Sequence, residues 1–369
     1  MTNFDNPLRQ LNAAGQSVWC DNIHRAMLTS GSLLAMIEAD DLRGITSNPA
    51  IFDKAISAGH AYDSILEREL GRDRQQSPRA LFFALAIEDI RDAADTMRPV
   101  YDRTDGVDGM VSLEVSPDLA QDAEATLREA HELHARLARP NVMIKVPGTK
   151  ACLPAIEQLT ADGININVTL LFSVERYAEV AEAYLRGLER RLVLGQPVDR
   201  IASVASFFIS RVDSLLDPML AEKRPELQGK IAIANAKLAY RCYQRLYGGA
   251  RFAALRAAGA HPQRLLWAST GAKNPAYPEL LYVEQLIGPE TVNTMPPATY
   301  DGFRAAGRVA RTLDQDVATA ERQLGALAEA GIDLATATER LEQEGLELFV
   351  KAFHNLLHHL EVKTARLAA

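Results

Sequence analysis

The stretch Ile164–Leu171, which reads ININVTLL, sets the first limit on the fold. Side chains alternate between the two faces of a β-strand. Asn165, Asn167 and Thr169 would therefore share one face, and the other face would be apolar. This pattern suits a barrel strand, because helices cover the outside of a barrel and polar groups line its mouth. The alternative is that the three polar side chains form a satisfied internal hydrogen-bond network.

Similar short runs, rich in β-branched and apolar residues, recur along the chain and alternate with longer stretches of helical periodicity. Further strands are expected at Ser17–Asp21, Arg43–Thr46, Met110–Val115, Asn141–Val146, Ile201–Ser206, Arg264–Ser269 and Thr291–Met295. Asp118–Ala138 and Val174–Leu194 have the spacing of amphipathic helices. Alternating strands and helices indicate a parallel sheet. About eight strands is the number that a closed barrel needs, so we predict an α/β fold, a (β/α)8 TIM barrel.

The other α/β architecture, an open doubly wound sheet, predicts a glycine-rich phosphate loop after an early strand. No such loop is present, and Gly271-Ala272-Lys273 lacks the earlier glycine of a phosphate loop. Strand patterns stop after Pro297, and Tyr300–Leu367 is predicted to be helical with a break at Gly331. We therefore expect a catalytic barrel domain over residues 1–297 and, over residues 298–369, a C-terminal helical extension packed on the barrel.

Composition limits the class of partner and the compartment. The chain has 369 residues and a formal net charge of -8, which argues against a nucleic-acid groove or an anionic membrane surface as the main partner. Cys20, Cys152 and Cys242 are few and widely spaced, which favours a reducing compartment. Met1–Pro7 has neither a basic nor an apolar segment typical of export. The predicted location is cytoplasmic.

Several polar side chains fall near the carboxyl ends of the expected strands, where barrel enzymes carry their chemistry. These are Asp21, Thr46, Asn48, Glu114, Ser116, Thr169 and Ser269. Because they come from several different strands, we expect most of them to meet at one mouth.

Lys145 lies inside the apolar run Val142–Pro147, which reads VMIKVP. Burying an ammonium group is costly, so such a pocket favours the neutral amine. A neutral amine can attack a carbonyl group and form a Schiff base. Alternatively, Lys145 reaches water at the strand end or pairs structurally with Glu114. Lys150 and Lys237 are predicted to be solvated.

A Schiff-base enzyme also needs groups that move protons. Asp21 and Glu114 come from different strands and would share the mouth with Lys145. For either carboxylate the alternative is a structural role, and for Asp21 this would be capping of the next helix.

Separated motifs resemble those of the transaldolases in order and spacing. They are GITSNP at 44–49, VMIK at 142–145 and NINVTLLFS at 165–173. The segments Trp267–Pro275 and Val292–Pro296 resemble the longer bacterial branch of that family. The resemblance extends over roughly Ser17–Met295.

This resemblance implies a (β/α)8 enzyme that needs no cofactor or metal and acts in the non-oxidative pentose phosphate pathway. Such an enzyme transfers a dihydroxyacetone unit from sedoheptulose 7-phosphate or fructose 6-phosphate to glyceraldehyde 3-phosphate or erythrose 4-phosphate. Lys145 matches the Schiff-base lysine, Asp21 the acid/base, and Glu114 with Thr169 the pair that handles a catalytic water. The positions that match substrate-binding residues are Thr46, Asn48, Asn167, Ser206, Phe208, Arg211 and Ser269.

Two departures from related enzymes bear on the site. The shorter transaldolases place a second phosphate arginine soon after the position of Ser269, where this chain offers Lys273 in a longer loop. Fructose-6-phosphate aldolases tend to carry glutamine at the position of Glu114 and tyrosine at that of Phe208. Glu114 and Phe208 therefore favour transfer over simple cleavage. The expected partners are sugar phosphates, and the expected state is a monomer or a homodimer.

Two other functions stay open at this point. A metal-dependent aldolase would need clustered ligands, and the chain has histidine pairs at helical spacing, His131 with His134 and His354 with His358. A sugar-phosphate-binding protein without catalysis could use the same barrel.

Overall fold

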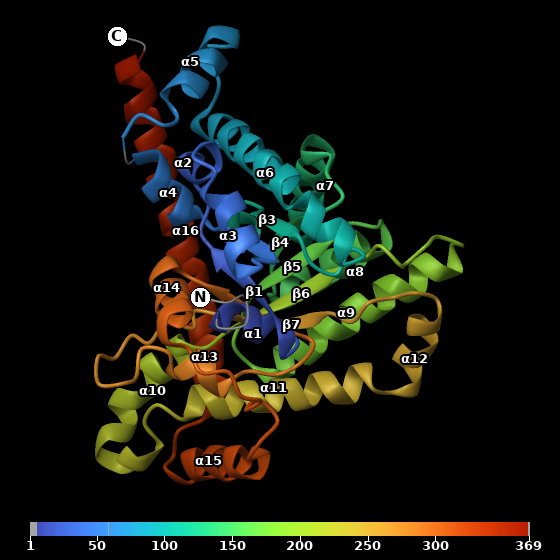
Figure 1. Cartoon of the computed structure of the whole chain (residues 1–369), viewed down its shortest axis with the longest axis vertical. Coiled ribbons are helices and arrows are strands. Elements are labelled where there is room, and N and C mark those ends of the chain that lie inside the picture. Colours follow the sequence, from blue (N-terminus) through green and yellow to red (C-terminus); the bar gives the residue numbers. More distant parts are fainter. Residues whose placement is uncertain (1–5, 58, 368–369) are drawn as a thin grey trace.

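The computed structural model describes residues 6–57 and 59–367. Residues 1–5, on which most of the export prediction rests, lie outside this range. The strands are β1 Gln16–Asp21, β2 Gly44–Thr46, β3 Met110–Glu114, β4 Val142–Pro147, β5 Ile166–Leu171, β6 Ser203–Phe208, β7 Arg264–Ala268 and β8 Thr291–Met295. They are all parallel and close into one barrel in chain order, with β8 paired to β1. Figure 1 shows the helices arranged around these central strands. The predicted (β/α)8 TIM barrel is confirmed.

Helices follow and surround the strands. They are α1 Pro7–Ala13, α2 Arg25–Thr29, α3 Ser32–Asp40, α4 Pro49–Ser57, α5 Asp63–Arg72, α6 Pro78–Arg103, α7 Ala123–Leu137, α8 Leu153–Ala161, α9 Val174–Val193, α10 Ser210–Lys223, α11 Ile231–Tyr247, α12 Ala250–Ala257, α13 Leu281–Gln285, α14 Pro297–Ala306, α15 Val317–Glu329 and α16 Leu334–Leu367. Three short 3₁₀ turns lie at Pro117–Leu119, Lys150–Cys152 and Pro225–Leu227. None of the described helices is both long and apolar enough to cross a membrane.

The predicted strands match the observed ones to within two residues. The largest differences are at β5 and β6, each of which begins two residues later than predicted. Asn165 precedes β5 because its side chain joins the adjoining loops: its Nδ2 donates to the Pro140 carbonyl (2.9 Å), and its Oδ1 accepts from the Ala202 amide (2.9 Å). Asn165 therefore links two loops through hydrogen bonds and does not belong to the mouth of the barrel.

Polar and aromatic side chains fill the half of the barrel interior that lies at the amino ends of the strands. Arg264 on β7 reaches across the barrel to Asp108 and to the Ser17 hydroxyl on β1, at 2.9 and 2.8 Å. One layer above, the indole of Trp19 lies against Gly44, its partner in the β1–β2 register. A Cβ atom at Gly44 would lie 2.4 Å from two ring atoms of Trp19. The glycine therefore leaves the space that the indole occupies beneath the mouth.

Replacing Gly44 with alanine should destabilise the protein strongly. The added methyl group would overlap the Trp19 ring, and such overpacking costs about 3 kcal/mol. Gly325, inside α15, is the matched control, because a Cβ there meets nothing within 4 Å. Gly325→Ala should stabilise the protein by about 0.5–1 kcal/mol through helix propensity. Thermal unfolding of both variants tests this, and equal stabilities would contradict the account of Gly44.

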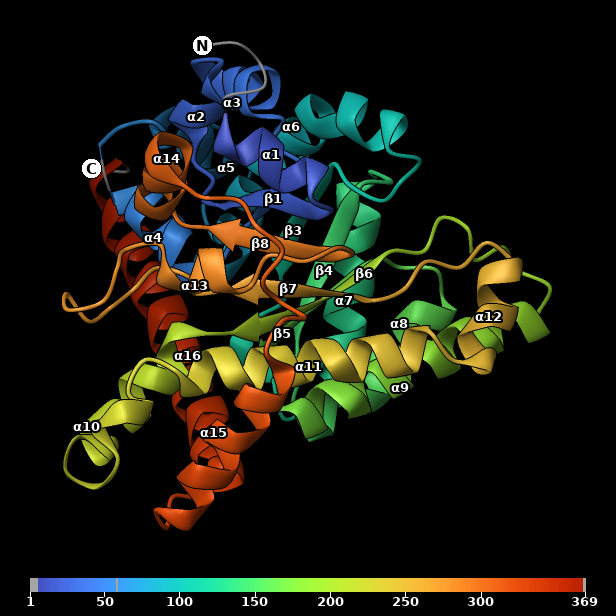
Figure 2. The same cartoon turned by 60° about the horizontal axis from the view of Figure 1, so that its bottom comes forward.

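The chain after residue 297 forms α14, α15 and α16, and Gly331 breaks it as predicted, with a positive φ of 72°. A second break, the non-helical segment 307–316 between α14 and α15, was not predicted. The long helix α16 contacts α4, α6, α10 and β5. Of these elements, α4 follows β2, α6 lies in the connection between β2 and β3, and α10 follows β6. Helix α16 therefore crosses the carboxyl ends of the strands. Figure 2 shows α16 on the side of the barrel toward which the strand arrows point.

Candidate active site

A pocket of about 430 Å³ opens at the carboxyl end of the barrel. Ten of the twelve site residues predicted from sequence line it: Asp21, Thr46, Asn48, Lys145, Thr169, Ser206, Phe208, Arg211, Ser269 and Lys273. The two exceptions are Glu114, which lines a small adjacent cavity, and Asn167, which is fully buried.

Lys145 is buried on β4, with an exposed fraction of 5%. Its Nζ lies 3.2 Å from Oε2 of Glu114, the residue paired with it in the β3–β4 register, and donates to the Ser47 carbonyl at 3.1 Å. The alternative in which this lysine reaches out to water is therefore wrong, whereas its pairing with Glu114 is observed. Burial raises the pKa of Glu114, and the nearby Lys145 ammonium lowers it in part.

Asp21 ends β1 and lines the same pocket as Lys145. The Thr46 hydroxyl donates to its Oδ1 at 2.6 Å, and Thr46 is itself 2.7 Å from the Thr294 hydroxyl on β8. Burial raises the pKa of Asp21, while the Lys145 charge and the hydrogen bond from Thr46 lower it in part. Asp21 does not cap the next helix, because His24 does so by accepting from the Met27 amide.

The three side chains singled out on the inner face of β5 and just before it differ in their partners. Asn167 donates to the Ser112 hydroxyl (3.1 Å) and accepts from the Ser206 hydroxyl (2.7 Å). The internal-network interpretation therefore holds for Asn167 as it does for Asn165. In contrast, the Thr169 hydroxyl is buried, lines the pocket and has no hydrogen-bond partner among the described residues. Such an unsatisfied group is suited to bind a water molecule or a substrate atom.

Positive charge gathers at the other end of the pocket. Arg211 lies in the first turn of α10, with its guanidinium carbon 5.5 Å from the Phe208 ring centre. Burial lowers the pKa of Arg211, and no acidic partner for it occurs within residues 6–57 and 59–367. The Ser269 hydroxyl and the exposed Lys273 line the same end. An unpaired guanidinium at a helix N-terminus is a site for an anionic group such as phosphate.

Several residues of the pocket wall were not predicted. Leu348, Phe349 and Ala352 come from α16, and Thr294 comes from β8. Thr294 could have been found, because it lies one residue before the end of a predicted strand, close to where Thr46 ends another. The sequence of α16 shows only an amphipathic pattern. Such a pattern predicts that one face of the helix is buried, but it does not predict which part of the protein that face contacts.

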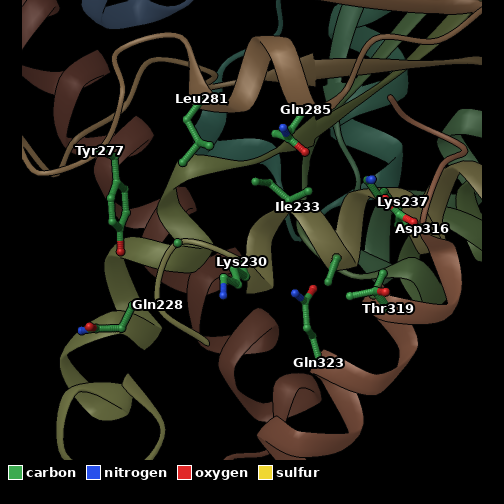
Figure 3. Close-up of a pocket in the computed structure, with 13 residues that line it drawn as sticks. Gln228, Lys230, Ile233, Lys237, Tyr277, Leu281, Gln285, Asp316, Thr319 and Gln323 are labelled. Atoms are coloured by element: carbon green, nitrogen blue, oxygen red, sulfur yellow. The ribbon is translucent and has the colours of Figure 1, made fainter. Parts of the chain in front are cut away.

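A second pocket, of about 400 Å³, lies between α11, α13 and α15 (Figure 3). It contains Lys237, which was predicted to be solvated but has an exposed fraction of only 7%. That prediction is wrong because α15 packs against α11, and Lys237 Nζ donates to the Gln315 carbonyl at 2.8 Å. Burial lowers the pKa of Lys237. Burial alone therefore does not distinguish Lys145 from Lys237. The difference is that Lys145 lies beside two acidic side chains at strand ends, Glu114 and Asp21.

One histidine of each pair considered as metal ligands is engaged with an acidic side chain. His131 Nε2 is 2.9 Å from Asp162, and His354 Nε2 is 3.0 Å from Asp118. Within the described part of the chain, His, Cys, Asp and Glu side chains form no group of three or more that could hold a metal ion. The three cysteines are buried and free.

Comparison with known proteins agrees with this geometry. Residues 18–360 match the family model described as transaldolase/fructose-6-phosphate aldolase. The chain is 47% identical to the transaldolase of Thermobifida fusca over 97% of this chain and 98% of the relative. It is 46% identical to that of Neisseria gonorrhoeae over 95% and 98%, and 43% identical to that of Trichodesmium erythraeum over 98% of each.

Proposed function

The chain belongs to the transaldolase/fructose-6-phosphate aldolase family and is an enzyme of the transaldolase type, and we propose that it forms its Schiff base on Lys145. The observation that carries this proposal is the position of the buried Lys145 amine, 3.2 Å from Glu114 and in the same mouth as Asp21. The donor is a ketose phosphate, sedoheptulose 7-phosphate or fructose 6-phosphate. The acceptor is an aldose phosphate, glyceraldehyde 3-phosphate or erythrose 4-phosphate.

The first step requires a neutral amine next to two carboxyl groups that favour the ammonium form. Glu114 and Asp21 both have raised pKa values, so either can accept a proton more readily than an exposed carboxylate. One of them takes the proton from Lys145, and the amine then attacks the ketone carbon of the donor. Glu114 and Thr169 hold the water that leaves on dehydration and returns on hydrolysis.

The second step breaks a carbon–carbon bond. Asp21 removes the proton of the C4 hydroxyl, the C3–C4 bond breaks, and its electron pair is taken up by the iminium as an enamine. The aldose phosphate leaves, and a second aldehyde enters. The enamine carbon then attacks that aldehyde, Asp21 returns the proton, and water releases the new ketose. Asn48 and Ser206 line the pocket and can bind hydroxyl groups of the three-carbon unit. Asn167 orients Ser206 by accepting a hydrogen bond from its hydroxyl group.

Borohydride reduction in the presence of fructose 6-phosphate tests the proposal. It should leave a stable adduct on the peptide that contains Lys145, identified by peptide mass mapping. A non-catalytic binding protein would bind the sugar phosphate and give no adduct. An adduct found only on another lysine would also overturn the assignment.

Replacing Arg211 should affect phosphorylated substrates selectively. Arg211→Met removes the unpaired guanidinium, so the KM for fructose 6-phosphate should rise roughly 10- to 100-fold. Arg211→Lys keeps the positive charge but cannot bind the phosphate in a bidentate way, so a smaller rise in KM is expected. The slow turnover of unphosphorylated fructose should be unchanged in both variants. An equal loss with fructose would show that Arg211 does not bind the phosphate; Lys273→Met provides the same comparison for the second cation.

The remaining predictions from sequence are part of the proposal. Glu114 and Phe208 favour transfer over simple cleavage, and the enzyme works in the cytoplasm without a cofactor as a monomer or a homodimer. We also propose that residues 1–297 form the catalytic barrel domain and that residues 298–369 form an extension that supplies one wall of its site.

A further inference from the structure

Phe349 on α16 faces the amine of Lys145. Its ring centre lies 5.6 Å from Nζ, and the residue is half-buried in the wall of the active-site pocket. Leu348 and Ala352 continue this wall along the same helix. The polar floor of the site therefore has an apolar cover that comes from the far end of the chain.

The close seating of α16 on β5 explains how Phe349 reaches this position. Gly345 lies one turn earlier on the same face of the helix. A Cβ atom at Gly345 would lie 3.1 Å from Cδ2 of Leu170, the residue after Thr169. Leu170 itself has a positive φ of 63°, where the β5–β6 register shifts. The glycine thus lets the helix approach the strand end, and Phe349 follows over Lys145.

Contacts on both sides of Phe349 hold α16 in this place. Before it, Glu342 lies 3.4 Å from Arg176 on α9. After it, the Phe353 ring packs edge-on against Phe82 of α6, with 5.7 Å between ring centres. Further along, Lys363 lies 2.8 Å from Asp63. These contacts hold the part of α16 that carries Phe349 against the barrel.

The enamine on Lys145 has two possible fates once the first aldose phosphate has left. It can attack a second aldehyde, which completes the transfer. Alternatively, its C3 carbon takes a proton from Asp21 or from water and becomes an iminium. Water then adds to C2, the C2–N bond breaks, and dihydroxyacetone leaves with the Lys145 amine restored. The water that Glu114 and Thr169 hold serves the final hydrolysis in both fates. The second fate is therefore favoured when bulk water reaches the enamine and protonates C3 before the acceptor arrives.

We propose that Phe349 is a specificity-determining residue, whose ring limits access of water to the three-carbon intermediate and so commits it to transfer rather than release. This inference deepens the proposed function and rests on the Schiff base at Lys145. Because the ring covers Nζ directly, it also covers the carbon that becomes bonded to Nζ. An exposed site would let the intermediate hydrolyse during the wait for an acceptor.

The experiment measures two products from the same reaction. With fructose 6-phosphate as donor and erythrose 4-phosphate as acceptor, the ratio of free dihydroxyacetone to sedoheptulose 7-phosphate reports the partition. Phe349→Ala should raise this ratio roughly tenfold, because it removes the ring and admits water. Phe349→Leu should stay close to the wild-type ratio, because an apolar cover remains. Leu357→Ala, on the same helix but outside the pocket, is the matched control and should not change the ratio.

Three outcomes would overturn the inference. These are an unchanged ratio in Phe349→Ala, a ratio in Phe349→Leu as high as in Phe349→Ala, or an equal rise in Leu357→Ala. The last would mean that any loosening of α16 has this effect. Failure of the proposed function looks different, since the wild-type enzyme would then give no borohydride adduct on Lys145. An adduct together with an unchanged ratio would disprove only the role of Phe349.

Discussion

Lys145→Met is expected to lower the transfer rate by roughly 10⁴-fold or more, because the covalent route through the imine is lost completely. Methionine has a similar length and no charge, so the buried site can accept it without strain. The lost amine leaves Glu114 without its 3.2 Å partner, and burial would then raise the pKa of this carboxyl group without an opposing lysine charge, which favours its neutral form. The fold should therefore survive, as circular dichroism and thermal unfolding can check.

Lys237→Met is the matched control for this variant. Lys237 is also buried and lines a pocket of similar size, and burial lowers its pKa, so it is a second candidate for a reactive amine. It lies between helices outside the barrel, without strand-end acids beside it. Lys237→Met should therefore keep the transfer rate and the borohydride adduct. If Lys145→Met kept turnover while Lys237→Met lost it, the assignment of the Schiff-base lysine would be reversed.

Much of the fold followed from residue alternation, and so did the position of most of the pocket. Strands with polar inner and apolar outer faces specify a barrel covered by helices, and a barrel brings the carboxyl ends of its strands together whatever their separation in sequence. This is why Asp21, Thr46 and Lys145 could be placed at one mouth. The two-residue error at the start of β5 wrongly placed Asn165 on the inner face, but it left Asn167 and Thr169 correctly on one face of the strand.

The parts that could not be predicted depend on packing between distant elements. Lys237 lies in an alanine-rich helical run that looks exposed, and only the packing of α15 against α11 buries it. Asn167 has the position of a ligand residue, and its hydrogen bonds with Ser112 and Ser206 could not be read from the alternation of β5 alone. Phe349 belongs to a helix whose apolar face indicates burial, but nothing in its own pattern indicates that Lys145 lies beneath it.

Asp21→Asn is expected to separate imine formation from bond cleavage. An amide cannot take the proton of the C4 hydroxyl, so the overall rate should fall by roughly 10²- to 10⁴-fold. The amide is close in size to the carboxylate, and it can still accept the 2.6 Å hydrogen bond from Thr46. Lys145 and Glu114 stay in place, so the imine with the intact donor should still form.

Borohydride trapping makes this separation visible as a change in adduct mass. With fructose 6-phosphate, the wild-type enzyme passes on to the enamine, so reduction should yield a three-carbon adduct on Lys145 alongside the six-carbon one. In Asp21→Asn the intact six-carbon phosphate adduct should dominate, because the intermediate accumulates before cleavage. Asp301→Asn, an exposed aspartate on α14, should behave like the wild type. A predominantly three-carbon adduct in Asp21→Asn would show that another group takes the C4 proton, and loss of every adduct would show that Asp21 acts earlier, when the amine of Lys145 is made neutral.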